Sequence, residues 1–162
     1  MLTLTAKGDT QVLVTRHFSA QPQQIWDAHV DANLIAHWML GPEGWVMTLC
    51  ESDGTPGGDI HFVWANATGQ TFSLTGEVLD VQPPTRMVHI ERMHLPNTIP
   101  DTTPDNHVET LIEPAGTGSK LTLIMTLPDR QTREVMLDTG MADGMEASYA
   151  RLDALLTPKE TP

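Results

Sequence analysis

The chain has 162 residues, the size of one domain, and 40% of them are hydrophobic while 19% are charged. That composition excludes a disordered chain and predicts a single domain over residues 1–162 with its core at about 11–157. Nine basic residues stand against 21 acidic ones, which gives a formal charge of -12. Nucleic acid and anionic lipid would both repel such a chain, so neither is expected as a partner.

The expected compartment is the cytoplasm. No apolar run approaches the roughly 18 residues that a membrane-spanning helix needs, and the start of the chain has neither a basic nor an apolar leader segment. Cys50 is the only cysteine, so no internal disulfide is expected.

The first third of the chain predicts one strand and two short helices. Residues Gln11–Phe18 are short and β-branched, as strands are. Pro22 is typical of a first helical position and opens an amphipathic helix. Asp31 is the expected N-cap of a second helix, which includes Trp38 and ends before Gly41.

Turn-rich sequences then separate six segments of strand length. Their separators include DGTPGG, NATG, QPPT and PAGTGS, which are typical of hairpins and loops. The pattern predicts a six-stranded antiparallel meander with strands at Trp45–Glu51, Asp59–Trp64, Thr71–Val81, Arg86–His94, His107–Glu113 and Lys120–Leu127.

The end of the chain predicts a long helix. Its apolar side recurs at spacings of three and four, and Pro158 ends the pattern. Gly140 and Gly144 each cost roughly 1 kcal/mol in a helix interior. Close approach of the helix backbone to the sheet or a ligand would offset that cost, and a break near Thr139 is an equal alternative.

This order of elements resembles the SRPBCC or START-like superfamily, and within it the branch of the C-terminal domain of the Hsp90 ATPase activator. The matching segments span almost the whole chain and are FSAQPQQIWDAHVDANLIAHW, DGTPGGDIHF, GEVLDVQPPTRMVHIE, EPAGTGSKLTLIM and GMADGMEASYARLDALL. The resemblance implies an α+β helix-grip fold: a curved antiparallel sheet of about seven strands, ordered β-α-α-β6-α, wrapped around a long C-terminal helix.

The resemblance also implies an apolar cavity between sheet and helix, without fixing one chemistry. Members of the superfamily include lipid carriers, hormone receptors, aromatic cyclases and chaperone activators. The chaperone activator carries a separate N-terminal chaperone-binding domain that has no counterpart in this sequence, so activation of a chaperone is not expected here.

Strand alternation and helix periodicity nominate the residues of that cavity. Methionines among them would adapt to ligands of different shape. A completely filled core would explain the same apolar positions, and anchoring of the short helices is the alternative for the tryptophans. The candidate ligand-binding residues are Trp38, Met39, Trp45, Trp64, Phe72, Leu74, Met125, Met141, Met145 and Tyr149.

Four further side chains are candidate polar groups of the cavity: His61, His89, Glu91 and Arg92. In the Arg86–His94 strand, His89 and Glu91 share one face and Arg92 lies on the other, and the pattern leaves open which face is inward. An inward Glu91 or Arg92 would fix a polar group of a ligand or transfer protons. The histidine spacing matches no zinc signature, so no metal and no cofactor are expected.

Three functions follow as hypotheses. The first is binding of a small, largely apolar molecule without covalent chemistry. Under this first hypothesis the protein is not an enzyme. The second hypothesis is a cofactor-independent cyclase, dehydratase or hydrolase that uses the same cavity. The third is an interaction protein whose acidic surface binds a chaperone, and a homodimer is the other candidate assembly.

Overall fold

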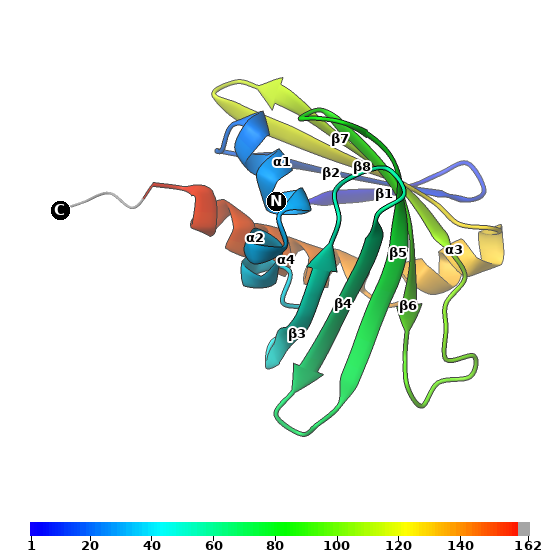
Figure 1. Cartoon of the computed structure of the whole chain (residues 1–162). Coiled ribbons are helices and arrows are strands. Elements are labelled where there is room, and N and C mark those ends of the chain that lie inside the picture. Colours follow the sequence, from blue (N-terminus) through cyan, green and yellow to red (C-terminus); the bar gives the residue numbers. More distant parts are fainter. Residues whose placement is uncertain (159–162) are drawn as a thin grey trace.

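A computed structural model describes residues 1–158 and shows one eight-stranded antiparallel sheet that bends around the C-terminal helix (Figure 1). The strand order across the sheet is β1-β2-β8-β7-β6-β5-β4-β3. The strands are β1 (Thr3–Lys7), β2 (Gln11–Phe18), β3 (Trp45–Ser52), β4 (Asp59–Asn66), β5 (Thr71–Gln82), β6 (Arg86–His94), β7 (Asn106–Ala115) and β8 (Gly118–Thr126).

The predicted meander is confirmed, because β3 to β8 are neighbours in chain order and β2 pairs with β8. The predicted count of about seven strands falls one short. The additional strand, β1, pairs with β2 through a turn in which Gly8 has a φ of 56°. β1 is short and mostly exposed, so it lacks the buried alternation that identifies a strand.

Both predicted short helices are present as α1 (Pro22–Val30) and α2 (Ala32–Trp38). Pro22 occupies the first turn of α1. The Asp31 side chain accepts a hydrogen bond of 2.9 Å from the backbone N–H of Asn33, which confirms it as the N-cap of α2. The two helices follow one another closely and cover one end of the concave face of the sheet (Figure 1).

The C-terminal helical region is broken, as expected from the alternative of a break near Thr139. α3 (Arg130–Leu137) and α4 (Met141–Leu156) are separated at Gly140, whose φ of 72° lies in the left-handed region. Approach of the helix backbone to the sheet was wrong for Gly144, because this residue is exposed and a Cβ placed on it would contact no protein atom within 4 Å. No close approach of the helix backbone offsets its cost.

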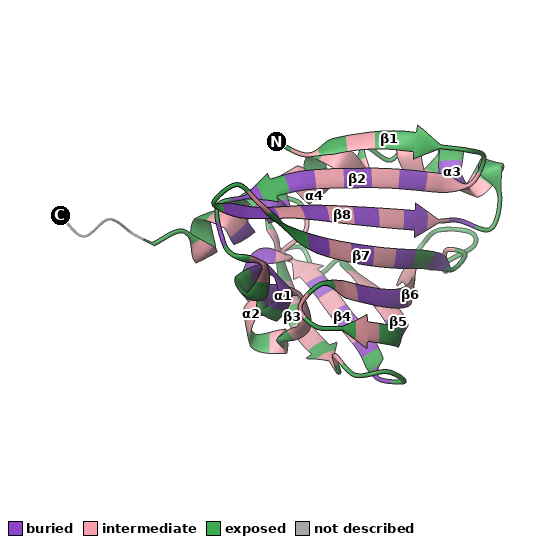
Figure 2. Cartoon of the chain, turned by 90° about the horizontal axis from the view of Figure 1, so that it is seen from above, coloured by how far each residue is buried: buried purple, intermediate pink, exposed green. Residues whose placement is uncertain are grey.

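A glycine and a bulge accompany the strong bend of the sheet. A Cβ on Gly76 of β5 would lie 2.1 Å from the carbonyl oxygen of Ile90 on β6, so only glycine fits there. The register of the same strand pair shifts between Val78 and Asp80. Viewed from above, β1, β2, β8 and β7 run in one direction and β3 to β6 turn away from them (Figure 2).

The core lies on the concave face. Strand alternation predicts that every second residue of β5 and β8 points inward, and Leu74, Val78, Leu121 and Leu123 on these faces are all buried. α4 is tied to the sheet by Arg16 of β2, which is 6% exposed and forms a bidentate pair with Glu146 at 3.1 Å. None of the helices in residues 1–158 is long and apolar enough to cross a lipid bilayer.

Candidate ligand site on the concave face

Apolar side chains on the concave face are buried to two different degrees. On β2, β7 and β8 they are almost completely buried, and we call the set Val12, Val14, Ile112 and Leu121 the packed half. On β3, β5, β6 and the first turns of α4, five apolar side chains contact the core but stay partly exposed, although Leu74, Val78 and Met87 of β5 and β6 are buried. We call this second set, Met47, Phe72, Met93, Met141 and Met145, the open half.

An aromatic cluster borders the open half. The Phe72 ring stacks on Trp64 at 4.7 Å and meets the Trp45 ring edge-on at 4.9 Å. Trp64 also donates a hydrogen bond of 2.8 Å from its indole nitrogen to the carbonyl oxygen of Met39. Trp64 is therefore a buried anchor for the α2–β3 connection, while Trp45 and Phe72 keep partly exposed faces.

A second aromatic cluster holds α4 against α1 and α2. The rings of Trp38, His29 and Tyr149 contact one another, with Trp38 at 5.0 Å from His29 and 5.5 Å from Tyr149, and His29 at 6.1 Å from Tyr149. The Trp38 indole N–H donates to the carbonyl oxygen of Ala28. Trp38 is 1% exposed. Trp38 therefore anchors α2 in the core. Anchoring of the short helices was the alternative to a cavity-lining role for the tryptophans.

A group of polar side chains lies next to these rings, and we call His29, His89, Glu91, Asn106 and Tyr149 the polar cluster. His89 and Glu91 project from the concave face of β6, and their Nε2 and Oε2 atoms are 3.0 Å apart. Asn106 on β7, which pairs with Glu91, donates from Nδ2 to Glu91 Oε1 at 3.3 Å. This arrangement settles the open question, because the His89–Glu91 face of β6 points inward.

His29 and Tyr149 join the cluster from α1 and α4. Burial lowers the pKa of His29 to about 4, and the nearby charge of His89 acts in the same direction. Burial also raises the pKa of Tyr149, and the carboxylate of Glu91 raises it further. Both side chains are therefore uncharged at neutral pH, inside a site that also holds a carboxylate.

Three atoms of the polar cluster are buried without a hydrogen-bond partner in the protein. They are His29 Nε2, His89 Nδ1 and Asn106 Oδ1, three of the four such side-chain atoms among residues 1–158. A buried polar atom without a partner costs about 1–3 kcal/mol. Native proteins contain few of them, so three in one cluster set this part of the molecule apart from the rest of the described core.

His61 and Arg92 do not belong to this site, so their nomination as cavity residues was wrong. His61 is 41% exposed on the outer face of β4, with Glu51 at 3.9 Å. Arg92 lies on the outer face of β6 and pairs with Glu77 at 3.2 Å and with Asp105 at 2.7 Å. Arg92 therefore forms surface ion pairs, one of them across the strand pair β5–β6.

The remaining predicted residues lie on the concave side. Leu74 on β5 and Met125 on β8 are buried, at 7% and 6% exposure, and so belong to the core. Met39 is half-buried where α2 ends, and Met141 and Met145 are half-buried along α4. Among residues 1–158, no group of three or more histidine, cysteine or acidic side chains is arranged to hold a metal ion.

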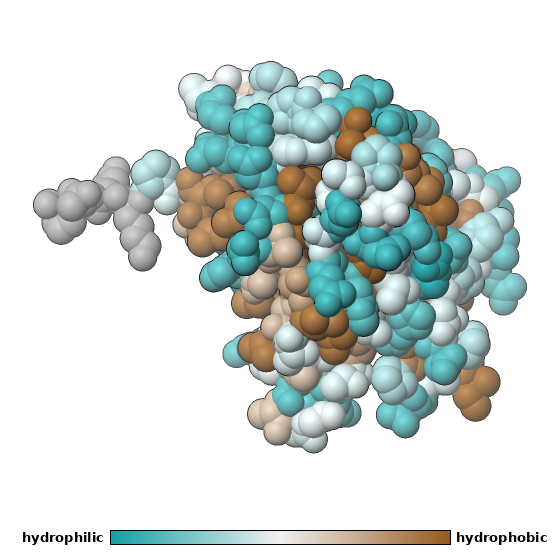
Figure 3. Space-filling view, viewed as in Figure 1, coloured by the Kyte–Doolittle hydropathy of each residue, from teal (hydrophilic) through white to brown (hydrophobic). Residues whose placement is uncertain are grey.

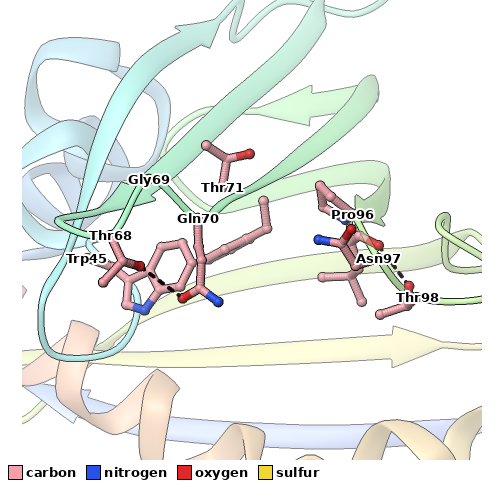
Figure 4. A pocket seen from close by; sticks show the side chains of 10 residues that line it. Trp45, Thr68, Gly69, Gln70, Thr71, Pro96, Asn97 and Thr98 are labelled. Atoms are coloured by element: carbon pink, nitrogen blue, oxygen red, sulfur yellow. Dashed lines mark hydrogen bonds between the residues drawn. The ribbon is translucent and has the colours of Figure 1, made fainter.

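An open groove of about 450 Å³ lies at the outer end of the aromatic cluster (Figure 4). Its walls are Trp45 and Phe72, the β4–β5 turn at 68–71, and the loop at 95–98 that follows β6. The backbone N–H of Leu95 donates to the carbonyl oxygen of Asp101, which ties this loop together. Elsewhere on the face seen in Figure 3, apolar groups reach the surface in separate patches among polar ones.

Two members of the polar cluster were missed by the sequence interpretation. Asn106 was assigned to a loop, although it continues the alternation of Val108 and Thr110 by one step and is 4% exposed. His29 was assigned to an amphipathic helix without a role. His29 follows Ile25 by four residues, so a helical wheel places both side chains on the same face of α1. The His29 ring contacts the Ile25 carbonyl oxygen at 2.7 Å.

Comparison with known proteins identifies the family. The model of the family described as "Activator of Hsp90 ATPase homolog 1-like protein" matches residues 19–157. No curated protein matches the chain. The Hsp90 activity in the family description belongs to its namesake and is no finding about this chain.

Solved structures agree over nearly the whole length. A Rhodobacter sphaeroides protein is 29% identical with a TM-score of 0.87, and the match covers 96% of this chain and 97% of that one. The AHSA1 protein of Silicibacter pomeroyi is 26% identical with a TM-score of 0.72, covering 90% and 96%. A Mycobacterium smegmatis protein shares the fold at 20% identity and a TM-score of 0.80, covering 98% and 100%. This chain therefore belongs to the Activator of Hsp90 ATPase homolog 1-like family, within the helix-grip SRPBCC superfamily.

Proposed function

We propose that the protein binds a small, largely apolar molecule between α4 and the open half of the concave face. The polar group of that molecule contacts the polar cluster. The observation that carries this proposal is the set of three buried, unpartnered polar atoms beside half-buried methionine and aromatic side chains. Sites for small molecules combine an apolar wall with a few convergent polar groups in this way.

The composition of the open half suits such a role. Four of its five members are methionines, namely Met47, Met93, Met141 and Met145. Their flexible thioethers fit ligands of different shape. Burial of apolar ligand surface at about 25 cal/mol per Å² drives micromolar affinity for a small molecule after the cost of association.

Fluorescence of N-phenyl-1-naphthylamine, a neutral apolar dye, tests the proposal. We expect a saturable rise in emission with one micromolar site on the wild-type protein. The Met145→Trp variant places a bulky ring beside the open half and should weaken dye binding by about tenfold or more. Leu155→Trp is the matched control, because Leu155 lies on the same helix but is 46% exposed.

Circular dichroism and urea unfolding of both variants show whether the fold is intact. Dye binding that does not saturate on the wild-type protein would contradict the proposal. Equal dye affinity for Met145→Trp and wild type, with both folded, would also contradict it.

Acid–base catalysis on the bound molecule is the second candidate function. The His89–Glu91 pair favours it, because a histidine 3.0 Å from a carboxylate inside an apolar site can accept or deliver a proton. In the hydrolase version, His89→Gln should lower turnover of 4-nitrophenyl butyrate by about 100-fold, while His61→Gln on the outer face leaves it unchanged. Equal rates in the two variants would reject this version.

A further inference from the structure

We infer that the polar group of the bound molecule is a hydrogen-bond donor, a hydroxyl or an amine, and that the site rejects carboxylates. This inference rests on the proposed function and adds the chemical class of the ligand. It follows from the hydrogen-bonding capacity of the atoms that the polar cluster leaves unpartnered.

His29 presents an acceptor. Its Nδ1 lies 2.7 Å from the carbonyl oxygen of Ile25, and a carbonyl oxygen only accepts, so Nδ1 carries the ring hydrogen. In the neutral ring the other nitrogen, Nε2, is then a bare lone pair. This atom is buried and has no donor within reach in the protein.

Asn106 presents a second acceptor. The Glu91 carboxylate accepts from His89 Nε2 and from Asn106 Nδ2, so these are the donating atoms. That leaves the carbonyl oxygen Oδ1 of Asn106 as an acceptor, and Nδ1 of His89 as the remaining ring nitrogen. Both atoms are buried without a partner, and the residues are 9% and 4% exposed.

The charges around the cluster point the same way. Glu91 adds a carboxylate that would repel a second one across a partly buried site. Arg16, the cation that interacts with Tyr149, is already engaged by both carboxylate oxygens of Glu146 and lies 3.6 Å from Asp153. A ligand carboxylate would therefore meet the acceptors of His29 and Asn106 and the negative charge of Glu91, whereas a hydroxyl or ammonium group would meet partners at these atoms.

Four ligands with one apolar chain test this inference: 1-octanol, octylamine, octyl methyl ether and octanoate. Each displaces N-phenyl-1-naphthylamine from the wild-type protein in a competition titration. We expect octanol and octylamine to bind about tenfold or more tightly than the ether, and octanoate to bind most weakly. The ether matches octanol in apolar length but has no hydrogen to donate.

A pair of matched variants links the preference to the cluster. His29→Phe removes the Nε2 acceptor and should lower the octanol-to-ether affinity ratio, while ether binding itself changes little. His37→Phe is the control, because His37 on α2 contacts its own helix carbonyl, that of Asn33, at 2.6 Å but is exposed. The octanol-to-ether ratio is the readout because loss of an acceptor weakens octanol alone, whereas a general loosening of the site would weaken both ligands.

A second measurement does not depend on a substitution. The ¹⁵N chemical shift of His29 Nε2 should move toward the hydrogen-bonded range when octanol is added and should stay unchanged with the ether. Equal affinities for octanol and ether, with dye still bound, would overturn the donor inference and leave the proposed function standing. Absence of dye binding would overturn both.

Discussion

The two halves of the concave face belong to one sheet but differ in how completely their apolar side chains are buried. In the packed half, Val12 and Leu121 are 0% and 1% exposed. In the open half, Phe72, Met93 and Met145 contact the core and still reach solvent. The same sheet therefore supplies a rigid, well-packed region and an adaptable one.

The two ends of α4 differ in burial in the same way as the two halves of the sheet. The later turns of α4 carry Tyr149 and Leu152, which are buried, whereas its first turns carry Met141 and Met145, which are half-buried. We expect substitutions in the packed region to act on stability and substitutions in the open region to act on binding.

The largest expected effect separates the two ends of α4. Leu152→Ala should lower the free energy of unfolding by about 3 kcal/mol, because Leu152 is completely buried and its loss leaves a cavity. Met145→Ala should lower it by only about 1 kcal/mol, since that side chain is already partly exposed. Urea unfolding measures both, and equal losses would erase the distinction between the halves.

A smaller effect is expected where the packed half is tied to α4. Glu146→Gln removes the charge partner of the buried Arg16 and should cost about 2 kcal/mol at pH 7. Hydrogen bonding from Arg16 lowers the pKa of Glu146, so its contribution is present above the usual pKa near 4.5 and is lost as the pH falls. The variant should therefore lose less stability than wild type on acidification, and parallel curves would contradict this role.

The polar cluster should be visible in the pH dependence of stability. The folded protein protonates His29 only near pH 4, whereas the unfolded chain does so near 6.5. Stability should therefore fall by about 1–2 kcal/mol between pH 7 and pH 5 through this residue. His29→Phe should flatten that part of the curve in urea unfolding. An unchanged slope would show that His29 is not buried as a neutral ring.

The smallest effect is expected on the outer face. Arg92→Gln breaks pairs with Glu77 and Asp105 that are largely solvent-exposed, and such pairs contribute less than about 1 kcal/mol. Dye binding should be unchanged because Arg92 points away from the site. A loss of dye affinity in this variant would indicate binding at the outer face of β6 and would contradict a site on the concave face.

Much of the fold could be predicted because local patterns decide it. Alternation fixed the inward faces of β5 and β8, and Asp31 marked the start of α2 through a side-chain cap. The position of the break in the C-terminal helix could not be decided, because Gly140 is compatible with a helix interior and with the left-handed turn it adopts. β1 depends on pairing with β2 and has almost no signal of its own.

The site was less predictable because it depends on contacts between distant elements. Alternation grouped His89 with Glu91 but could not say that this face is inward, which the pairing of β6 with β5 and β7 determines. His29 and Asn106 gain their importance from unpartnered atoms, a property that no spacing in the sequence reveals. Trp38 looked like a lining residue until its burial placed it in the core.

Methionine-methyl NMR observes the open half itself, since four of the chain's nine methionines belong to it. We predict that 1-octanol shifts the ε-methyl signals of Met93, Met141 and Met145 in a saturable way, while Met1, which is 98% exposed, stays unchanged. Signals from the open half that remain still, or that move no more than that of Met1, would contradict a binding site beneath α4.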